Sequence, residues 1–299
     1  MMQHTPSFQY GKDDLDSAFG DRFSGFRLLG KGGEGAVLAV WDRIKKVDLA
    51  LKISLDSGSP EQAQRFESEY HILAVARSER LVRVFDHGRR GIFRNGQAIP
   101  HFWYSMERCD ASLRQTFKNL GLADRLTVVL QMLDGLALLH AKNIAHRDIK
   151  PENLFLMMSD EKGLSVKIGD FGIATVARRA PNAVGGMVYG SPAYLAPERW
   201  EHEADADWQP ADQYAAAVTM YEILSLGQAP LDYTQGYERA HTHGAYRPLR
   251  IPELRAWPLS GVNSVIKRML AKQPNWRHRD IASCKRELES ALLQDGVTG

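Results

Sequence analysis

The sequence has few cysteines, no long apolar run and no marked excess of either charge. Its 299 residues contain two cysteines, Cys109 and Cys284, and carry a formal net charge of +2. Two cysteines without metal-ligand spacing exclude a disulfide framework and favour a reducing, cytoplasmic environment. No apolar run approaches the ~18 residues of a membrane span, and the N-terminal segment lacks the apolar core of a signal peptide.

The small net charge also argues against a dedicated nucleic-acid-binding protein. A content of 44% hydrophobic and 25% charged residues is ordinary for a globular protein, and the length allows one large domain or two lobes. We therefore expect a folded protein without a nucleic-acid partner, and the sequence does not indicate an oligomeric state.

Hydrophobic patterning divides the chain into a β-rich part and a helical part. Residues 1–25 are polar and predict a lead-in segment without a core element. Residues 26–108 contain short β-rich runs, one amphipathic helix and an Asn-Gly hairpin turn at Asn95. Residues 109–292 are mostly helical with two short strands, and residues 293–299 form a tail. The predicted fold class is α+β, with a small β-rich lobe before a larger helical lobe.

The stretch GFRLLGKGGEGAVLAV, residues 25–40, carries glycines that fit three phosphate-binding devices. A dinucleotide-binding turn needs a helix to begin within the glycines, but an apolar, β-rich run follows them. A P-loop needs a hydroxyl after its lysine, and Lys31 is followed by Gly32. A glycine-rich turn between two antiparallel strands remains, whose amides can approach phosphates. Taken alone, the motif is better interpreted as an ordinary hairpin.

A lysine on a predicted buried strand is a second candidate for a phosphate contact. Lys52 lies in ALKIS, a strand that should return beside the glycine-rich turn. Because an unpaired buried ammonium is unfavourable, Lys52 should have an acidic partner. The helix that follows offers Glu67 and Glu69 as partners, and the alternative for each is a solvent-exposed helix acid.

Two motifs in the helical part decide between these interpretations. HRDIKPEN, residues 146–153, resembles the catalytic loop of eukaryotic-type (Hanks-type) Ser/Thr protein kinases, and DFG, residues 170–172, resembles their magnesium-binding motif. Both motifs follow the glycine-rich turn and Lys52 along the chain, which is the order found in the family. An eight-residue match followed by DFG does not arise by chance. The resemblance covers about residues 26–292, and the segment DQYAAAVTMYEIL, residues 212–224, resembles bacterial members most.

The resemblance implies a bilobal protein-kinase fold and roles in phosphoryl transfer from ATP. Asp148 would orient the attacking hydroxyl and accept its proton, while Lys150 would neutralise charge on the transferring group. Asn153 and Asp170 would supply oxygen ligands to Mg²⁺, or to Mn²⁺ in its place.

The resemblance also implies an ATP site. Glu69 matches the family's helix glutamate that pairs with the strand lysine, and Phe155 stands where an aliphatic residue is more usual. The glycine-rich turn would cover the phosphates, Met106 would be the gatekeeper, and backbone groups of Glu107 and Cys109 would contact the adenine. The implied nucleotide-binding residues are Leu29, Gly30, Gly32, the additional Gly33, Gly35, Val37, Ala50, Lys52, Met106, Glu107, Cys109, Phe155 and Asp170.

Further matches lie downstream. GSPAYLAPE, residues 190–198, resembles the family's substrate-docking segment, and its Glu198 is expected to pair with Arg277. Asp212 resembles the aspartate that braces the catalytic loop, whereas His146 and Phe171 are expected to serve in packing.

Two function classes follow. The first is an ATP-dependent Ser/Thr protein kinase, and the second is an ATP-binding pseudokinase or scaffold of the same fold. A small-molecule kinase is a weaker third option, because residues 190–198 resemble a protein-docking segment. Between Gly172 and Gly190 the only hydroxyl side chains are Thr175 and Tyr189. The sequence therefore predicts that catalysis does not depend on a phosphothreonine in the middle of that segment.

Overall fold

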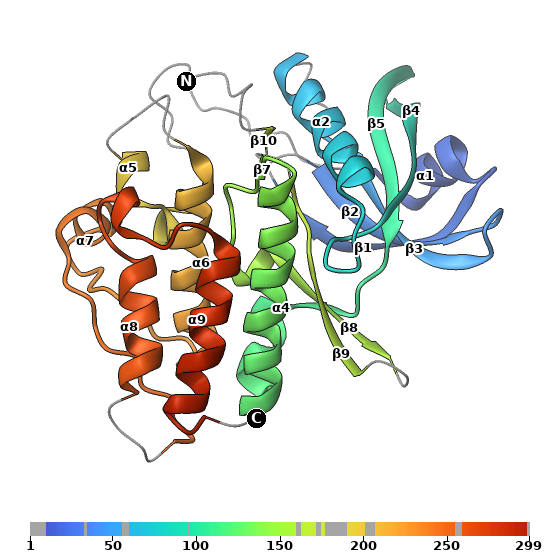
Figure 1. The fold of residues 1–299 in the computed structure, drawn as a ribbon. Coiled ribbons are helices and arrows are strands. Elements are labelled where there is room, and N and C mark those ends of the chain that lie inside the picture. The colour runs from blue at the N-terminus through green and yellow to red at the C-terminus, as the bar shows by residue number, and fades with distance from the viewer. Residues whose placement is uncertain are drawn as a thin grey trace. The chain divides into compact units, whose positions relative to one another are not determined.

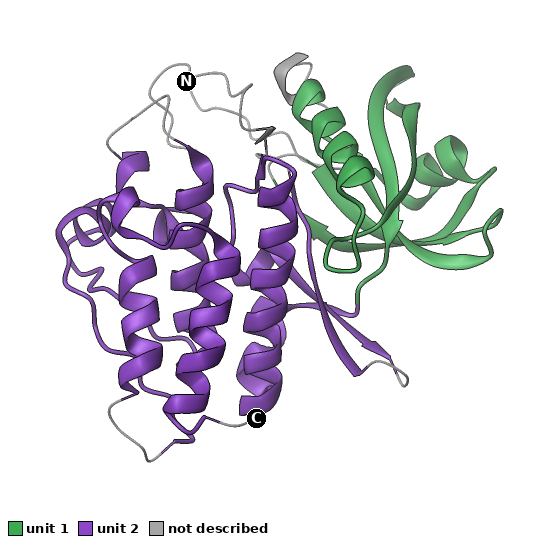
Figure 2. Ribbon diagram, in the orientation of Figure 1, with its two compact units in different colours: residues 1–109 green, residues 110–299 purple. Residues whose placement is uncertain are grey.

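The structure is a computed structural model that describes residues 10–32, 35–55, 60–94, 96–159, 163–171, 175–176, 190–200, 207–254 and 259–297. The chain separates into two units, residues 1–109 and residues 110–299 (Figure 2). The first unit is built on a five-stranded sheet, and the second is mostly helical. The predicted α+β architecture with a small β-rich part and a larger helical part is confirmed.

An antiparallel sheet forms the first unit, with strand order β1-β2-β3-β5-β4 (Figure 1). The strands are β1 (Phe23–Lys31), β2 (Gly35–Asp42), β3 (Val47–Ser54), β4 (Val84–Arg94) and β5 (Gln97–Glu107), and α2 (Pro60–Ala76) lies between β3 and β4 in the chain. Arg94 pairs with Gln97 at the predicted hairpin turn. Gly96 in that turn has a φ of +78°, which favours glycine, and Asn95 lies outside the described residues.

The two faces of this sheet have different partners because side chains alternate along each strand. Leu51 of β3 and Trp103 of β5 belong to the hydrophobic core of the unit. Lys52 points to the other face, directly across from Tyr104. The ring of Phe66 on α2 lies 5.2 Å from that of Tyr104, so α2 covers the face that carries Lys52.

The N-terminal segment contributes to the core, contrary to the expectation for residues 1–25. Helix α1 (Lys12–Phe19) buries Leu15 and Phe19 in the cluster that contains Trp103. The rings of Phe19 and Trp103 meet edge to face, with centroids 6.1 Å apart. Two apolar residues four positions apart make one narrow stripe on an otherwise polar helix. That stripe is too short to be distinguished from a solvated segment by composition.

Leu15→Ala is expected to lower the free energy of unfolding by ~2 kcal/mol, because it removes a buried side chain from the core. This loss lies at the lower end of the range for Leu→Ala substitutions in a core. An eight-residue helix at the surface can shift and fill part of the space that the Leu15 side chain leaves. Chemical denaturation measures it, and Leu293→Ala at an exposed position is the matched control. Equal unfolding midpoints for Leu15→Ala and the wild type would contradict a core role for α1.

The second unit is organised around α6 (Trp208–Leu224), which is buried on nearly all sides. A helix that is apolar around its circumference is expected in an interior. Helix α4 (Leu122–Ala141) packs against α6 and α9 (Ile281–Gln294), and α8 (Ser260–Met269) packs against α9 (Figure 1). Helix α9 continues to Gln294 and Val297 is buried, so the predicted tail of residues 293–299 begins inside a helix.

Short elements position most of the remaining site residues. Strands β6 (Ala111–Ser112), β8 (Leu154–Ser159) and β9 (Gly163–Ile168) form one small sheet, and β7 (Ile144–Ala145) pairs with β10 (Thr175–Val176). The short helices are α3 (Leu113–Thr116), α5 (Pro197–Trp200) and α7 (Tyr237–His243), with 3-10 turns η1 (Phe117–Asn119), η2 (Pro151–Asn153), η3 (Pro192–Tyr194) and η4 (Pro274–Trp276). No helix in the described part of the chain is long and apolar enough to cross a membrane.

Candidate active site

The glycine-rich stretch joins two antiparallel strands, as the sequence predicts. Gly30 of β1 pairs with Val37 of β2, and the amide of Gly32 donates to the carbonyl of Gly35 at 2.9 Å. A Cβ at Gly35 would lie 2.4 Å from the carbonyl oxygen of Ile53, so neighbouring β3 excludes any side chain there. Gly33 lies outside the described residues.

Lys52 forms the predicted ion pair with Glu69. Its Nζ lies 2.6 Å from Glu69 Oε2, and both side chains are buried. The choice between the two candidate acids follows from helix geometry, because residues two positions apart point to nearly opposite sides. The Glu69 side chain is 1% exposed, whereas that of Glu67 is 42% exposed and pairs with Arg89.

Several predicted nucleotide contacts share the sheet face of Lys52. Val37 lies directly across from Lys52, and Ala50 lies directly across from Met106. The amide of Glu107, at the end of β5, donates to the carbonyl of Arg83 at 2.9 Å. Side chains on one face of neighbouring strands form a continuous surface.

The other predicted nucleotide contacts occupy exposed or peripheral positions. Leu29 is exposed on β1 beside the glycine-rich turn. Cys109 is partly exposed, forms no disulfide and follows β5. Phe155, in the second unit, lies on β8 opposite Ser112 of β6. The adenine contacts assigned to these residues stay a prediction.

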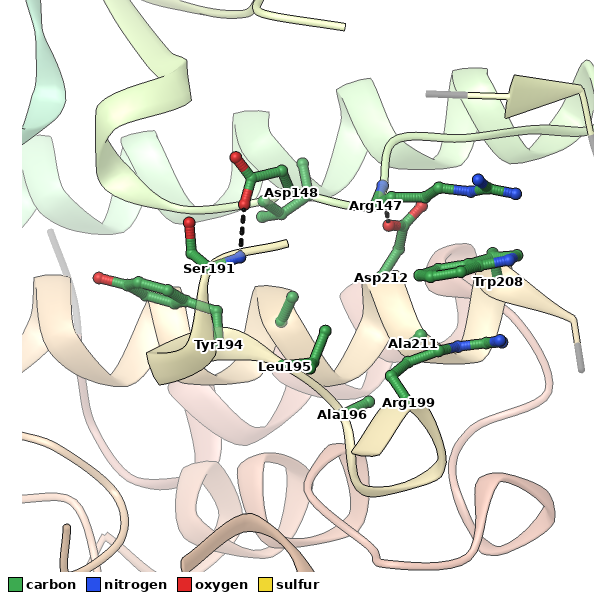
Figure 3. A pocket seen from close by; sticks show the side chains of 12 residues that line it. Arg147, Asp148, Ser191, Tyr194, Leu195, Ala196, Arg199, Trp208, Ala211 and Asp212 are labelled. Atoms are coloured by element: carbon green, nitrogen blue, oxygen red, sulfur yellow. Dashed lines mark hydrogen bonds between the residues drawn. The ribbon is translucent and has the colours of Figure 1, made fainter. Parts of the chain in front are cut away.

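In the second unit, three donors hold the carboxylate of Asp148. Lys150 Nζ lies 2.6 Å from Oδ2, and Asn153 Nδ2 donates to the same oxygen at 3.0 Å. The backbone amide of Ser191 donates to Oδ1 at 3.1 Å (Figure 3). Lys150 also contacts the Ser191 hydroxyl at 2.7 Å. The arrangement fixes the direction of one carboxylate at the junction of the catalytic loop and the segment that begins at Gly190.

Asp212 of α6 braces the backbone just before Asp148, as predicted. Its two carboxylate oxygens accept hydrogen bonds from the amides of His146 and Arg147 at 2.8 and 2.7 Å. Burial alone would raise the pKa of Asp212, but the hydrogen bond and charge of His140, with contributions from His146, lower it below the usual range. The brace matters because Arg147 has a φ of +72°, a left-handed conformation that is unfavourable for a side chain with a Cβ.

The predicted packing role of His146 agrees with its environment. The side chain is fully buried, and its Nε2 lies 3.1 Å from the carbonyl oxygen of Gly169. The ring meets that of Phe171 at 4.7 Å between centroids.

Asn153 and Asp170 supply the oxygen donors that a magnesium ion prefers. The carbonyl of Asn153 accepts from the amide of Gly169 at 3.0 Å, which ties η2 to the residue before Asp170. Among the described residues, no group of three or more His, Cys, Asp or Glu could hold a metal ion. A pair of oxygen-donating side chains nevertheless fits Mg²⁺, which usually keeps waters and phosphate oxygens among its ligands.

A buried, bidentate ion pair anchors the segment resembling a docking site. Arg277 Nη1 and Nη2 each lie 2.7 Å from one carboxylate oxygen of Glu198. Both residues are buried, so the pair is shielded from solvent. The predicted pairing of Glu198 with Arg277 is therefore observed.

Two side-chain groupings of the second unit were not predicted from the sequence. Arg114 of α3 bonds to Glu152, Glu222 and the hydroxyl of Tyr194. The guanidinium of Arg147 lies over the ring of Trp208, with the guanidinium carbon 4.2 Å from the ring centroid. One sequence signal could have revealed the second contact, because Trp208 precedes Asp212 by four residues, which places both on one side of a helix.

His241 of α7 belongs to a group of aromatic side chains that contacts the segment of residues 190–198. The hydroxyl of Tyr214 lies 2.9 Å from its Nδ1, and the ring of Tyr233, whose hydroxyl donates to the carbonyl of Ala193, lies 5.4 Å away. Burial, with a smaller contribution from the charge of Lys272, lowers the pKa of His241 to about 4. The folded protein therefore holds the neutral imidazole.

His241 is expected to make stability depend on pH. In the unfolded chain its pKa is ~6.5, so below that pH the unfolded state binds a proton that the folded state excludes. The contribution of neutral His241 to the free energy of unfolding is fully present above pH ~6.5. It decreases as pH falls toward 4, by ~2 kcal/mol between pH 7 and pH 5. His241→Phe should flatten this decrease in the free energy of unfolding. An unchanged pH dependence in that variant would contradict the assignment.

The comparisons with known proteins agree with these observations. The family described as the protein kinase domain matches residues 23–287, and the chain belongs to this family. The chain is 31% identical over 292 residues to serine/threonine-protein kinase Pkn1 of Myxococcus xanthus, covering 93% of this chain and 40% of Pkn1. It is 30% identical over 288 residues to serine/threonine-protein kinase PknF of Mycobacterium tuberculosis, covering 92% of this chain and 58% of PknF.

These similarities confirm the predicted relationship to bacterial eukaryotic-type Ser/Thr protein kinases. A third relative, serine/threonine-protein kinase PknA of Mycobacterium tuberculosis, is 30% identical over 260 residues, which are 85% of this chain and 57% of PknA. The chain thus spans less than two thirds of the length of the curated relatives that it matches.

Proposed function

We propose that this chain is an ATP-dependent Ser/Thr protein kinase that transfers the γ-phosphoryl group of ATP to serine or threonine hydroxyls of protein substrates. The observation that carries the proposal is the carboxylate of Asp148, held by Lys150, Asn153 and the amide of Ser191. A fixed carboxylate can orient a hydroxyl and accept its proton. Lys150 beside it would offset charge on the transferring group.

The first unit would bind the nucleotide. Lys52, held by Glu69, would contact the ATP phosphates, and the glycine-rich turn would offer backbone amides to them. We propose that the surface formed by Val37, Ala50 and Met106 contacts the adenine.

A divalent ion would complete the cofactor set. We propose that Asn153 and Asp170 hold Mg²⁺, with Mn²⁺ as an alternative, because both side chains offer oxygen donors. When bound, the ion would neutralise charge on the ATP phosphates. Removal of divalent ions with EDTA should therefore stop transfer, and added Mg²⁺ should restore it.

Two alternatives have less support. A pseudokinase would explain the fold, but the chain retains every residue assigned to transfer, including Lys52, Glu69, Asp148 and Asp170. A small-molecule kinase would not need residues 190–198, whose anchoring by the buried Glu198 ion pair favours a protein substrate. We place the protein in a reducing, cytoplasmic environment because neither of its two cysteines forms a disulfide.

Transfer of labelled phosphate from ATP to a generic protein substrate such as casein tests the proposal. The wild type should label the substrate, and Asp148→Asn should label it far more weakly. Wild-type protein that binds ATP without any transfer would instead support the pseudokinase alternative. Labelling of a small molecule but of no protein would support the third class.

A further inference from the structure

Two arginines of the second unit stack on one tryptophan. The guanidinium carbon of Arg147 lies 4.2 Å from the ring centroid of Trp208, and that of Arg199 lies 3.8 Å from it. Figure 3 shows Trp208 between the two side chains, at one end of a small pocket that also contains Asp148 and Ser191. Trp208 therefore connects the catalytic loop to α5, which follows the segment of residues 190–196.

Arg147 has few other partners for its charge. Its Nε and Nη2 are buried, and within the described parts of the chain neither has a hydrogen-bond partner. Burial lowers the pKa of Arg147 to about 10; the charge of Asp212 opposes this shift, and that of Arg199 adds to it. The charges of Arg147 and Arg199 repel each other, and the carboxylate of Asp212 attracts both. The indole ring of Trp208, which both guanidiniums contact, adds a second attraction. The face of an indole ring attracts a cation.

The backbone adds a second reason to hold this side chain. Arg147 has its left-handed φ of +72° immediately before Asp148. Its amide is fixed by Asp212, and its guanidinium by Trp208. If the side chain is released, the backbone can relax toward an ordinary conformation, and the Asp148 carboxylate turns with it.

The segment that follows DFG offers no carboxylate for Arg147. Between Phe171 and Pro197 the sequence contains neither Asp nor Glu, and its arginines, Arg178 and Arg179, add positive charge. An acidic partner from this segment would have to be created by phosphorylation.

We propose that Trp208 is a positioning residue that holds Arg147, and through it Asp148, in the reactive arrangement without a phosphorylated residue. The inference rests on the proposed function, because it concerns the same reaction. It assigns to an aromatic ring, together with the carboxylate of Asp212, the stabilisation of positive charge that a phosphorylated residue would otherwise supply. Trp208 touches neither substrate nor nucleotide in this role.

The test compares two apolar variants of Trp208, one without an aromatic ring and one with a smaller ring. Trp208→Leu keeps an apolar side chain and removes the ring, whereas Trp208→Phe keeps a smaller ring. We expect Trp208→Leu to lower kcat for casein phosphorylation by ~10-fold or more, with KM for ATP within about twofold of the wild type. Trp208→Phe should recover much of the loss. Trp276→Leu, at an exposed position, is the matched control and should match the wild type.

A double-mutant cycle separates positioning from general structural support. Once Arg147→Met has removed the stacked cation, Trp208→Leu should lower kcat by less than about twofold further. Independent, multiplicative losses would overturn the inference, as would wild-type kcat in Trp208→Leu. If Trp208→Leu does not fold, as judged by thermal unfolding, the same cycle is measured with Trp208→Met, which also lacks the ring, and multiplicative losses there would likewise overturn the inference.

Phosphatase treatment tests the second half of the inference, namely that the reactive arrangement does not need a phosphorylated residue. Dephosphorylated wild-type protein, checked by mass spectrometry, should keep its kcat, and a large loss reversed by phosphorylation would overturn this half. Failure of the proposed function has a different result, because then the wild type itself would show no transfer that depends on Asp148.

Discussion

Asp148→Asn is expected to lower kcat for protein phosphorylation by about 10²- to 10⁴-fold, which is the contribution of a positioned general base. Asparagine has nearly the same shape, and its amide oxygen can still accept from the backbone amide of Ser191. Its amide nitrogen, however, would then face Lys150 and Asn153, which are both donors to the present carboxylate. The variant therefore loses the proton acceptor and the interaction that fixes Lys150.

Steady-state kinetics with casein and ATP measure this effect, and titration with a fluorescent ATP analogue measures nucleotide binding. Binding should stay within about threefold of the wild type, because Asp148 is assigned to the hydroxyl group and not to ATP. Asp134→Asn on α4 makes the same chemical change at a partly exposed site paired with Lys285 and should leave kcat unchanged. Equal kcat for Asp148→Asn and the wild type would remove Asp148 as the base.

The chemistry of the site could be predicted from the sequence because it depends on short stretches of chain. HRDIKPEN places Asp148, Lys150 and Asn153 within six consecutive residues, so one loop brings them together. Long-range partners such as Glu198 and Arg277 followed only from the family resemblance. No local pattern connects two residues 79 positions apart.

The features that were missed depend on tertiary contacts. Because α1 is mostly polar, its composition does not indicate that Leu15 and Phe19 are buried. Their burial follows from the fold, in which they pack on the sheet face that carries Leu51 and Trp103. The stack on Trp208 was equally hidden, because Arg147 and Arg199 come from separate segments of the chain. In both cases the side chains gained their role from neighbours that local periodicity does not identify.

The choice of Glu69 over Glu67 illustrates the boundary between these two kinds of information. The sequence required an acidic partner for a buried lysine and placed two acids on the right helix. Which acid faces the sheet depends on the rotation of α2 about its axis, and apolar contacts such as that of Phe66 with Tyr104 set this rotation. The resemblance to a family with a known register supplied the answer that periodicity alone left open.

Glu69→Ala is expected to lower both stability and activity, because it leaves the buried ammonium of Lys52 without this carboxylate. Breaking a buried ion pair by removing one partner costs ~3–5 kcal/mol of unfolding free energy. Replacement of both partners by apolar residues, as in Lys52→Met with Glu69→Leu, is often neutral for stability. The double variant should therefore unfold within ~1 kcal/mol of the wild type. Its kcat/KM for ATP should nevertheless be lower by ~10²-fold or more, since the cation assigned to the phosphates is gone.

Urea denaturation and steady-state kinetics on the same three proteins separate the two effects. Glu67→Ala, on the exposed side of the same helix, is the matched control and should change the unfolding free energy by less than ~1 kcal/mol. A double variant that is stable and fully active would show that the Lys52–Glu69 pair serves only the fold. A double variant as unstable as Glu69→Ala would show that packing around α2, and not the unpaired charge, determines the loss. The predicted combination, restored stability without restored transfer, requires that the ammonium group itself acts on the nucleotide.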